Sequence, residues 1–278
     1  MEFKKEITEA DISINELLLY AKPKMGKTDL ISRLPNIGII DIEGGSDAVR
    51  GYKYVVKYSD PLKTLENLNK CLDWIIKDNP HDFYAFDTLT HLEDCCEIEG
   101  TYNYMNSPQG KKFNTVDKEL IAKYPELKDF EGKRIDHNSK LWQSVHSLGQ
   151  GYGYQWSRNC FIKYFNKMKS CPGKKIFIAH IKDKLIEATS GEEIQGRDIN
   201  LTGKLRSITT SYTDTIGYLF RGKDGNTWLS FKSGESVAEG SRRGYLSGQE
   251  FMIGEWDKEK HDYKSVHWDL IFKDLKTN

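Results

Sequence analysis

Short apolar runs alternate with amphipathic segments through the first half of the chain. Four runs have the length and composition of buried strands: 17–20, 37–42, 54–58 and 83–87. A short helical segment, 28–34, follows the first run and ends before Pro35. A longer one begins at Pro61, keeps helical spacing through Ile75 and ends before Pro80. Strands that alternate with helices predict an α/β fold with a mostly parallel sheet covered by helices on both faces.

The pattern changes in the second half of the chain. Residues 99–138 mix glycine, proline, lysine and tyrosine, and we interpret them as a partly irregular insertion. A helix is expected over 142–169, with a break near the glycines of 149–153, and a fifth buried strand over 175–180. Hairpin-like apolar runs follow at 185–188, 215–220 and 227–231, with a last strand near 266–272. We therefore expect one domain over 1–278, with antiparallel strands toward the C-terminus.

Composition limits the choice of partner and compartment. The 278 residues carry 41 Lys and Arg against 41 Asp and Glu, so the formal net charge is zero and any nucleic-acid surface must be a local patch. No apolar run approaches the roughly 20 residues that cross a bilayer, and the charged start has no signal-peptide core. Five cysteines without a CxxC pair favour reduced thiols over a zinc site. We expect a cytoplasmic protein with no membrane contact.

The segment from Ala21 to Thr28 has the pattern of a phosphate-binding loop, G-x-x-x-x-G-K-[ST], except that alanine replaces the first glycine. It follows an apolar run and opens a helix, and this context favours a P-loop over a chance match in a lysine-rich loop. Lys27 can reach the β- and γ-phosphates, and the Thr28 hydroxyl can bind Mg²⁺. The residues expected to hold the nucleotide are Lys22, Pro23, Lys24, Met25, Gly26, Lys27, Thr28 and Asp29.

Ala21 stands where the P-loop pattern has its first glycine, and this substitution affects the shape of the loop. Alanine takes a positive φ angle only at a steric cost. The chain must then enter the loop with ordinary backbone angles, and Gly26 is left to supply the close approach to phosphate.

Carboxylates end two of the predicted strands. Asp87 ends the run 83–87, where it can bind the metal beside a P-loop, or cap the helix that follows. Glu43 follows the run 37–42 and can polarise a water molecule against the γ-phosphate. Asp41 competes for that role, because side-chain alternation places it on the same face as Glu43. We favour Glu43 as the base.

These segments together resemble the RecA-like ATPases. The resemblance implies that Glu43, in the D-x-E element IIDIEGGSD, is the catalytic base, and that Asp87 in FDTLT binds the metal. The next core strand, KIFIAH, implies that His180 senses the γ-phosphate, although RecA typically has glutamine there. A polar residue that merely ends the strand is the alternative. The implied ligands are ATP and Mg²⁺.

More narrowly, residues 15–95 and 174–235 are similar to compact phage nucleotide-binding proteins, some of which anneal single strands in recombination. That class commonly forms rings or filaments, in which a basic residue of a neighbouring subunit neutralises the γ-phosphate. Lys232 is the favoured candidate, with Arg206, Arg242 and Arg243 as alternatives. An exposed lysine on a hairpin is the competing interpretation of Lys232.

Single-stranded DNA is the expected substrate partner. Basic residues gather in the loop region after His180, namely Lys182, Lys184, Arg197, Lys204 and Arg206. Tyr154 and Trp156 lie among glycines, where aromatic rings could stack on bases, or instead pack into the core or cover the nucleotide.

We therefore expect a Mg²⁺-dependent ATPase that acts with single-stranded DNA in phage recombination, annealing or replication, in the host cytoplasm if a phage encodes it. A single-strand binding protein is a further candidate partner. The alternative is a nucleotide-gated scaffold that hydrolyses ATP slowly and has no direct DNA role. A small-molecule kinase is disfavoured by the D-x-E element and by the absence of an evident arginine-rich lid.

Overall fold

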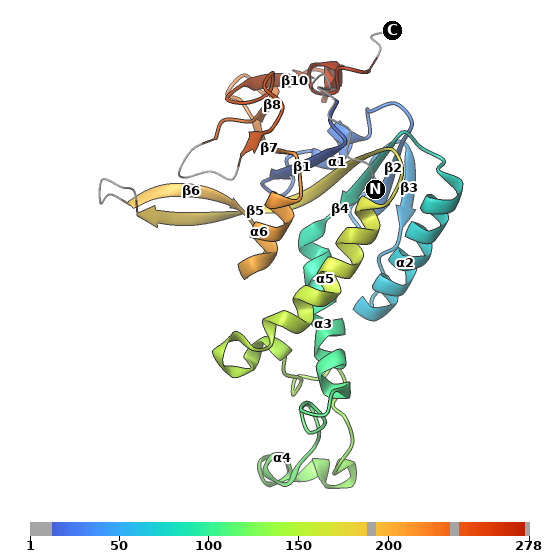
Figure 1. Ribbon diagram of the computed structural model, residues 1–278, viewed down its shortest axis with the longest axis vertical. Helices are drawn as coiled ribbons and strands as arrows, with labels where there is room; N and C mark the ends of the chain where they lie inside the picture. Colours follow the sequence, from blue (N-terminus) through green and yellow to red (C-terminus); the bar gives the residue numbers. More distant parts are fainter. Residues whose placement is uncertain (1–12, 188–192, 234–238, 276–278) are drawn as a thin grey trace, which may run out of the picture.

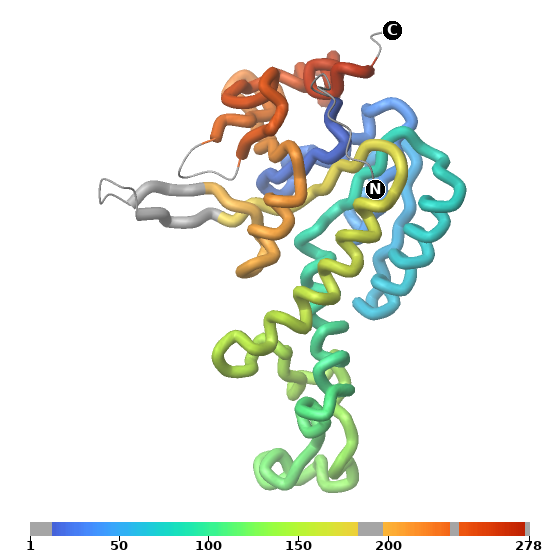
Figure 2. Tube along the Cα trace, in the orientation of Figure 1, coloured from blue at the N-terminus to red at the C-terminus, as the bar shows by residue number. Residues whose placement is uncertain are grey.

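The computed structural model describes residues 13–187, 193–233 and 239–275 (Figure 2). Within these ranges the strands form one sheet in the order β11-β10-β8-β7-β1-β5-β4-β2-β3, with β6 paired to β5 and β9 to β7. The strands are β1 (Glu16–Ala21), β2 (Ile37–Asp41), β3 (Tyr52–Val55), β4 (Phe83–Asp87), β5 (Lys174–Glu187), β6 (Glu193–Ile199), β7 (Thr215–Arg221), β8 (Thr227–Ser230), β9 (Gly240–Ser241), β10 (Glu250–Asp257) and β11 (Asp262–Val266). The helices are α1 (Lys27–Ile31), α2 (Pro61–Asp78), α3 (Leu89–Asn106), α4 (Lys118–Lys123), α5 (Tyr154–Lys169) and α6 (Gly203–Ser211).

The sheet has a parallel part and an antiparallel part. Neighbouring strands from β7 through β1, β5, β4 and β2 to β3 all run parallel. On the far side of β7, strands β8, β10 and β11 pair antiparallel. The predicted α/β class is confirmed, as is the prediction of antiparallel strands toward the C-terminus.

Each face of the sheet has its own hydrophobic core. Leu18 and Tyr20 of β1 point to the face covered by α2, α3, α5 and α6, and Leu17 and Leu19 point to the other. That second face is covered by α1 and by the C-terminal segment, whose Trp268 donates its indole N–H to the carbonyl of Leu30 at 3.0 Å. Figure 1 shows α2, α3 and α5 on one side of the parallel strands. Because both faces of these strands are covered, each strand is a continuous apolar run in the sequence.

Local sequence signals fix α2. Asp60 caps the helix, since its side chain accepts a hydrogen bond from the Leu62 N–H at 2.9 Å, and Pro61 takes the first helical position. Asn79 ends it in the left-handed conformation, at φ 43°. The buried face carries the predicted leucines and Ile75, so this helix is confirmed.

Several predicted elements are wrong in their bounds. The third strand covers 52–55 rather than 54–58, and α5 begins at Tyr154 rather than 142, because the glycine-rich stretch before it forms short 3₁₀ turns. The last strand is β11, which ends at Val266, and a 3₁₀ turn covers Trp268–Leu270. The apolar run there is buried as an irregular segment, which periodicity cannot distinguish from a strand. Strands β6 and β10 were not predicted, and Ala188 of the expected 185–188 run lies outside the described residues.

The expected insertion begins inside a regular helix, since α3 continues to Asn106. Beyond it, the chain forms an arm that extends away from the sheet and carries α4 at its tip (Figure 1). Asn114 holds this arm together by donating to the carbonyl of Gln143 and accepting from its N–H, each at 2.8 Å. Within the described residues, no helix combines the length and the apolar character needed to span a membrane.

Candidate active site

The phosphate loop connects β1 to α1 at the carboxyl edge of the parallel strands. Ala21 is the fully buried last residue of β1, so the loop is entered with extended backbone, as expected from the missing glycine. The positive φ angles fall later, at Lys24 (61°) and Gly26 (77°). Gly26 is the N-cap of α1, which leaves the first N–H groups of the helix without helical partners and available to an anion.

Lys27 points back into the loop. Its ammonium lies 3.3 Å from the carbonyl of Lys22 and 3.5 Å from Nδ1 of His180, and the residue is 7% exposed. Burial lowers the pKa of Lys27, while Asp87 and Glu43 act in the opposite direction. Among the described residues, this buried cation is held by a carbonyl and an imidazole, neither of which is charged like a carboxylate, so it is suited to receive phosphate charge.

Thr28 and Asp87 meet across the strand ends. The Thr28 hydroxyl donates a hydrogen bond of 2.6 Å to Oδ2 of Asp87, which is 6% exposed. Burial raises the pKa of Asp87, against the effect of the Thr28 hydrogen bond. Asp29, which follows, directs its carboxylate to Arg33 at 3.4 Å.

Asp41 and Glu43 have different environments, and this bears on which of them can act as a base. Asp41 is 1% exposed and accepts hydrogen bonds from the N–H groups of Gly44, Gly45 and Ser46 and from the Ser46 hydroxyl. Its carboxylate is therefore fully engaged in holding the turn after β2. Glu43 lies at the tip of that turn with a side chain that is 41% exposed.

We predict that Asp41→Ala destabilises the fold rather than removing a reacting group. Two buried donors, the N–H and the hydroxyl of Ser46, would lose their acceptor, and hydrogen bonds to a charged group contribute about 1.5–3 kcal/mol each. The free energy of unfolding in urea should fall by about 3 kcal/mol. Asp47→Ala, at an exposed position of the same turn, is the control and should change it little. Equal stability of the two variants would contradict this role.

Glu43 forms a hydrogen bond with His180. Nε2 of His180 lies 3.0 Å from one carboxylate oxygen of Glu43 and 3.2 Å from the other. This hydrogen bond is the main reason why the pKa of Glu43 is lowered to about 2, with a further hydrogen bond from Thr88. Glu43 is therefore a carboxylate at neutral pH.

His180 lies between Lys27 and Glu43. An ammonium group only donates hydrogen bonds, so Nδ1 of His180 must accept from Lys27, and Nε2–H then donates to Glu43. The predicted strand end is wrong, because β5 continues beyond His180 into a hairpin with β6. His180 nevertheless lies at the carboxyl edge of the core sheet, opposite Ala21, the last residue of β1.

Two residues of this site were missed by sequence reasoning. Thr88 caps α3 through the N–H of His91 and also bonds Glu43. Thr90 accepts a hydrogen bond from the His180 N–H at 3.1 Å and donates to the carbonyl of Asn200 at 3.3 Å. The sequence signal for them was two threonines, at the first and third positions after Asp87.

Three of the basic residues expected to act on a neighbour, namely Lys232, Arg242 and Arg243, lie away from this site. Strand β8 is antiparallel to β7, so Lys232, beyond its end, lies at the opposite edge of the sheet from the P-loop. Lys232 pairs with Glu250 at 2.7 Å, and both Arg242 and Arg243 pair with Asp214. The role of Lys232 stays a prediction.

The two aromatic residues expected near DNA have different surroundings. Trp156 is partly buried and packs edge-on against Tyr104, with ring centroids 5.6 Å apart. This contact favours the alternative in which Trp156 packs against the protein rather than on a base. Tyr154 is 42% exposed. Of the predicted cations, Arg206 pairs with Asp198, and the side chain of Lys184 lies outside the described part of the chain.

Comparison with known proteins shows the protein family to which the chain belongs. The AAA domain family matches residues 14–243, which is most of the chain. The chain belongs to the AAA domain family. With the phosphate loop described above, this family match identifies a P-loop ATPase domain. Residues 244–275 of the ATPase, beyond the family match, include β10 and β11 and pack Trp268 on α1.

No curated protein matches the ATPase. Among solved structures, it is similar to a prototypical ATPase from the type III secretion system of pathogenic bacteria, with 11% sequence identity and a TM-score of 0.35. The match covers 75% of this chain and 53% of that one, so it spans about half the length of that protein.

Proposed function

We propose that the ATPase hydrolyses ATP with Lys27 on the β- and γ-phosphates and Glu43 as the base that activates water. The observation that carries this assignment is the row of side chains in which His180 joins Lys27 to Glu43, with Thr28 and Asp87 beside it. A phosphate-binding cation, a hydroxyl–carboxylate pair and the Glu43 carboxylate, which His180 holds, thereby converge at one edge of the sheet. These are the parts that phosphoryl transfer to water requires.

The residues present fit Mg²⁺. Thr28 and Asp87 offer two hard oxygen ligands 2.6 Å apart, and Mg²⁺ commonly takes one or two protein oxygens and completes its shell with phosphate and water. Within the described residues no cluster of three His, Cys, Asp or Glu side chains could hold a metal alone, in keeping with an ion that arrives with the nucleotide. When bound, it would supply positive charge to the phosphate oxygens.

We assign His180 the role of a nucleotide sensor. While His180 donates to Glu43, the carboxylate is a weak base, with its pKa at about 2. A γ-phosphate that attracts Lys27 and the His180 N–H would release Glu43 from this hydrogen bond. The same carboxylate would then accept a proton from water more readily, so the base would be activated only when nucleotide is bound.

We further propose that the ATPase acts with single-stranded DNA, in phage recombination, annealing or replication. The similarity of its motifs to phage nucleotide-binding proteins supports this role, and so does a link within the fold. Thr90 bonds both His180 and Asn200, and Asn200 also donates its N–H to the His180 carbonyl at 2.9 Å. Asn200 leads directly into the basic start of α6, so a strand bound there could influence the γ-phosphate sensor.

Phosphate release with and without single-stranded DNA tests this role. We predict that DNA accelerates hydrolysis, and that Thr90→Val reduces the ratio of the two rates by about 3- to 10-fold, because one hydrogen bond contributes about 0.5–1.5 kcal/mol. Thr90→Ser keeps the hydroxyl and should keep the ratio. A wild-type rate that ignores DNA, together with no DNA binding at low salt, would contradict the DNA role. Equal ratios in all three proteins would contradict the link.

We also propose that the ATPase forms rings or filaments. The position of Lys232 supports this idea, since a residue at the far edge of the sheet could reach a γ-phosphate only in a neighbouring subunit. It would have to leave Glu250 to do so.

A further inference from the structure

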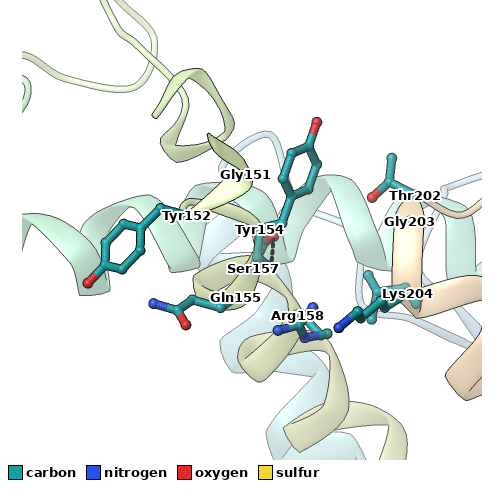
Figure 3. A pocket seen from close by; sticks show the side chains of 10 residues that line it. Gly151, Tyr152, Tyr154, Gln155, Ser157, Arg158, Thr202, Gly203 and Lys204 are labelled. Carbon is teal, nitrogen blue, oxygen red and sulfur yellow. Dashed lines mark hydrogen bonds between the residues drawn. The ribbon is translucent and has the colours of Figure 1, made fainter. Parts of the chain in front are cut away.

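The starts of α5 and α6 enclose two adjoining cavities, which we call the α5–α6 groove. Their volumes are about 360 Å³ and about 560 Å³, and both are lined by Tyr154, Thr202 and Gly203. Figure 3 shows Arg158 of α5 and Lys204 of α6 pointing toward one another across the first cavity. The groove thus brings an aromatic ring and cations from two helices to one surface.

The ring of Tyr154 is held in a fixed orientation. It stacks on the imidazole of His146, with centroids 4.2 Å apart and planes inclined by 19°. His146 is fixed in turn by Glu97, 3.3 Å from its Nδ1, and by the Ser157 hydroxyl, 2.7 Å from its Nε2. An exposed aromatic ring normally loses rotamer freedom on binding a ligand, and this arrangement removes much of that loss beforehand.

The cations of the groove are available to a ligand. Arg158, Lys182 and Lys204 each line a cavity, and none of them forms an ion pair with another residue that the structure describes. Arg206 differs, because Asp198 neutralises it. The three unpaired charges are spread over both cavities, which suits a chain of successive phosphates better than a single phosphate group.

We propose that the α5–α6 groove is the single-stranded DNA site, in which one base stacks on Tyr154 and the flanking phosphates contact Arg158, Lys182 and Lys204. The inference rests on the proposed DNA role and names the surface that performs it. Stacking on an aromatic ring tolerates every base, and phosphate contacts carry no sequence information. The site therefore predicts binding that is strong in low salt and indifferent to sequence.

Fluorescence anisotropy with labelled oligothymidylate, Mg²⁺ and a non-hydrolysable ATP analogue tests the site. Tyr154→Ala should weaken binding about 5- to 150-fold, since stacking contributes about 1–3 kcal/mol per base. Tyr154→Phe keeps the ring and should bind like the wild type. Lys204→Ala should lower the slope of log affinity against log salt by about 0.7, the value for one contact to a single strand.

The matched control is Tyr58→Ala, because Tyr58 is similarly exposed (46%) and also lies beside a lysine, Lys63. It should leave the affinity unchanged, and thermal unfolding of every variant confirms folding. Wild-type affinity in Tyr154→Ala and Lys204→Ala would overturn the groove while leaving the DNA role intact. Absence of binding by the wild type would overturn the DNA role itself. Equal competition by thymidine monophosphate, nucleotide for nucleotide, would show a mononucleotide pocket and overturn the proposal.

Discussion

Lys27→Ala should abolish measurable ATP turnover, with a loss of about 10²–10³-fold or more in kcat. Removal of a single preorganised group that stabilises transition-state charge has an effect of that size. Lys27 is the buried cation of the loop, and its hydrogen-bond partners among the described residues are the Lys22 carbonyl and His180. Its side chain is therefore available to the phosphates. Phosphate release at saturating ATP and Mg²⁺ gives the comparison.

Lys24→Ala is the control for this experiment, because Lys24 is an exposed lysine of the same loop. The loop is expected to hold nucleotide there through its backbone, so turnover should change by less than about threefold, within the range of ordinary surface substitutions. A Lys27→Ala protein that hydrolyses ATP at the wild-type rate would remove the P-loop from the mechanism.

Glu43→Gln should separate ATP binding from hydrolysis. General-base catalysis contributes about 10²–10⁴-fold, so kcat should fall by that factor. Binding of a fluorescent ATP analogue should persist, because Lys27, Thr28 and the loop are untouched. The glutamine can still accept a hydrogen bond from Nε2 of His180, which preserves the local geometry.

Asp47→Asn provides the comparison for Glu43→Gln, since it neutralises an exposed acid in the same turn. It should retain the wild-type kcat. If Glu43→Gln were as active as Asp47→Asn, the base would have to be sought elsewhere. Asp41 would not be the next candidate, because its oxygens already bind the Gly44, Gly45 and Ser46 donors.

The parallel half of the fold follows from patterns that local sequence carries. Strand β4 was predicted at its observed bounds, and α2 began and ended at Pro61 and before Pro80, as capping chemistry requires. Strands that are covered on both faces are continuous apolar runs, so they can be predicted from the sequence alone. Strand β6 has a polar sequence and, within the described residues, pairs with the extension of β5, so no local pattern predicts it.

A residue of the candidate site could be predicted from the sequence when it lies at or after the end of a recognisable strand. Lys27, Thr28, Glu43 and Asp87 all satisfy that condition. The sequence could not show which hydrogen bonds each carboxylate accepts. These contacts, made in the folded structure, are what distinguish Asp41 from Glu43. The link through Thr90 joins residues 90 positions or more apart, so it had no local signal either.

A crystal structure of the ATPase with Mg²⁺ and a non-hydrolysable ATP analogue tests the central claim most directly. The account predicts that the Lys27 ammonium has left the Lys22 carbonyl for the β- and γ-phosphates, and that Thr28 and Asp87 face the metal. It also predicts that Glu43, released by His180, bonds a water molecule in line with the γ-phosphorus. A nucleotide bound away from the loop, or a γ-phosphate with no carboxylate of Glu43 within reach of its attacking water, would contradict it.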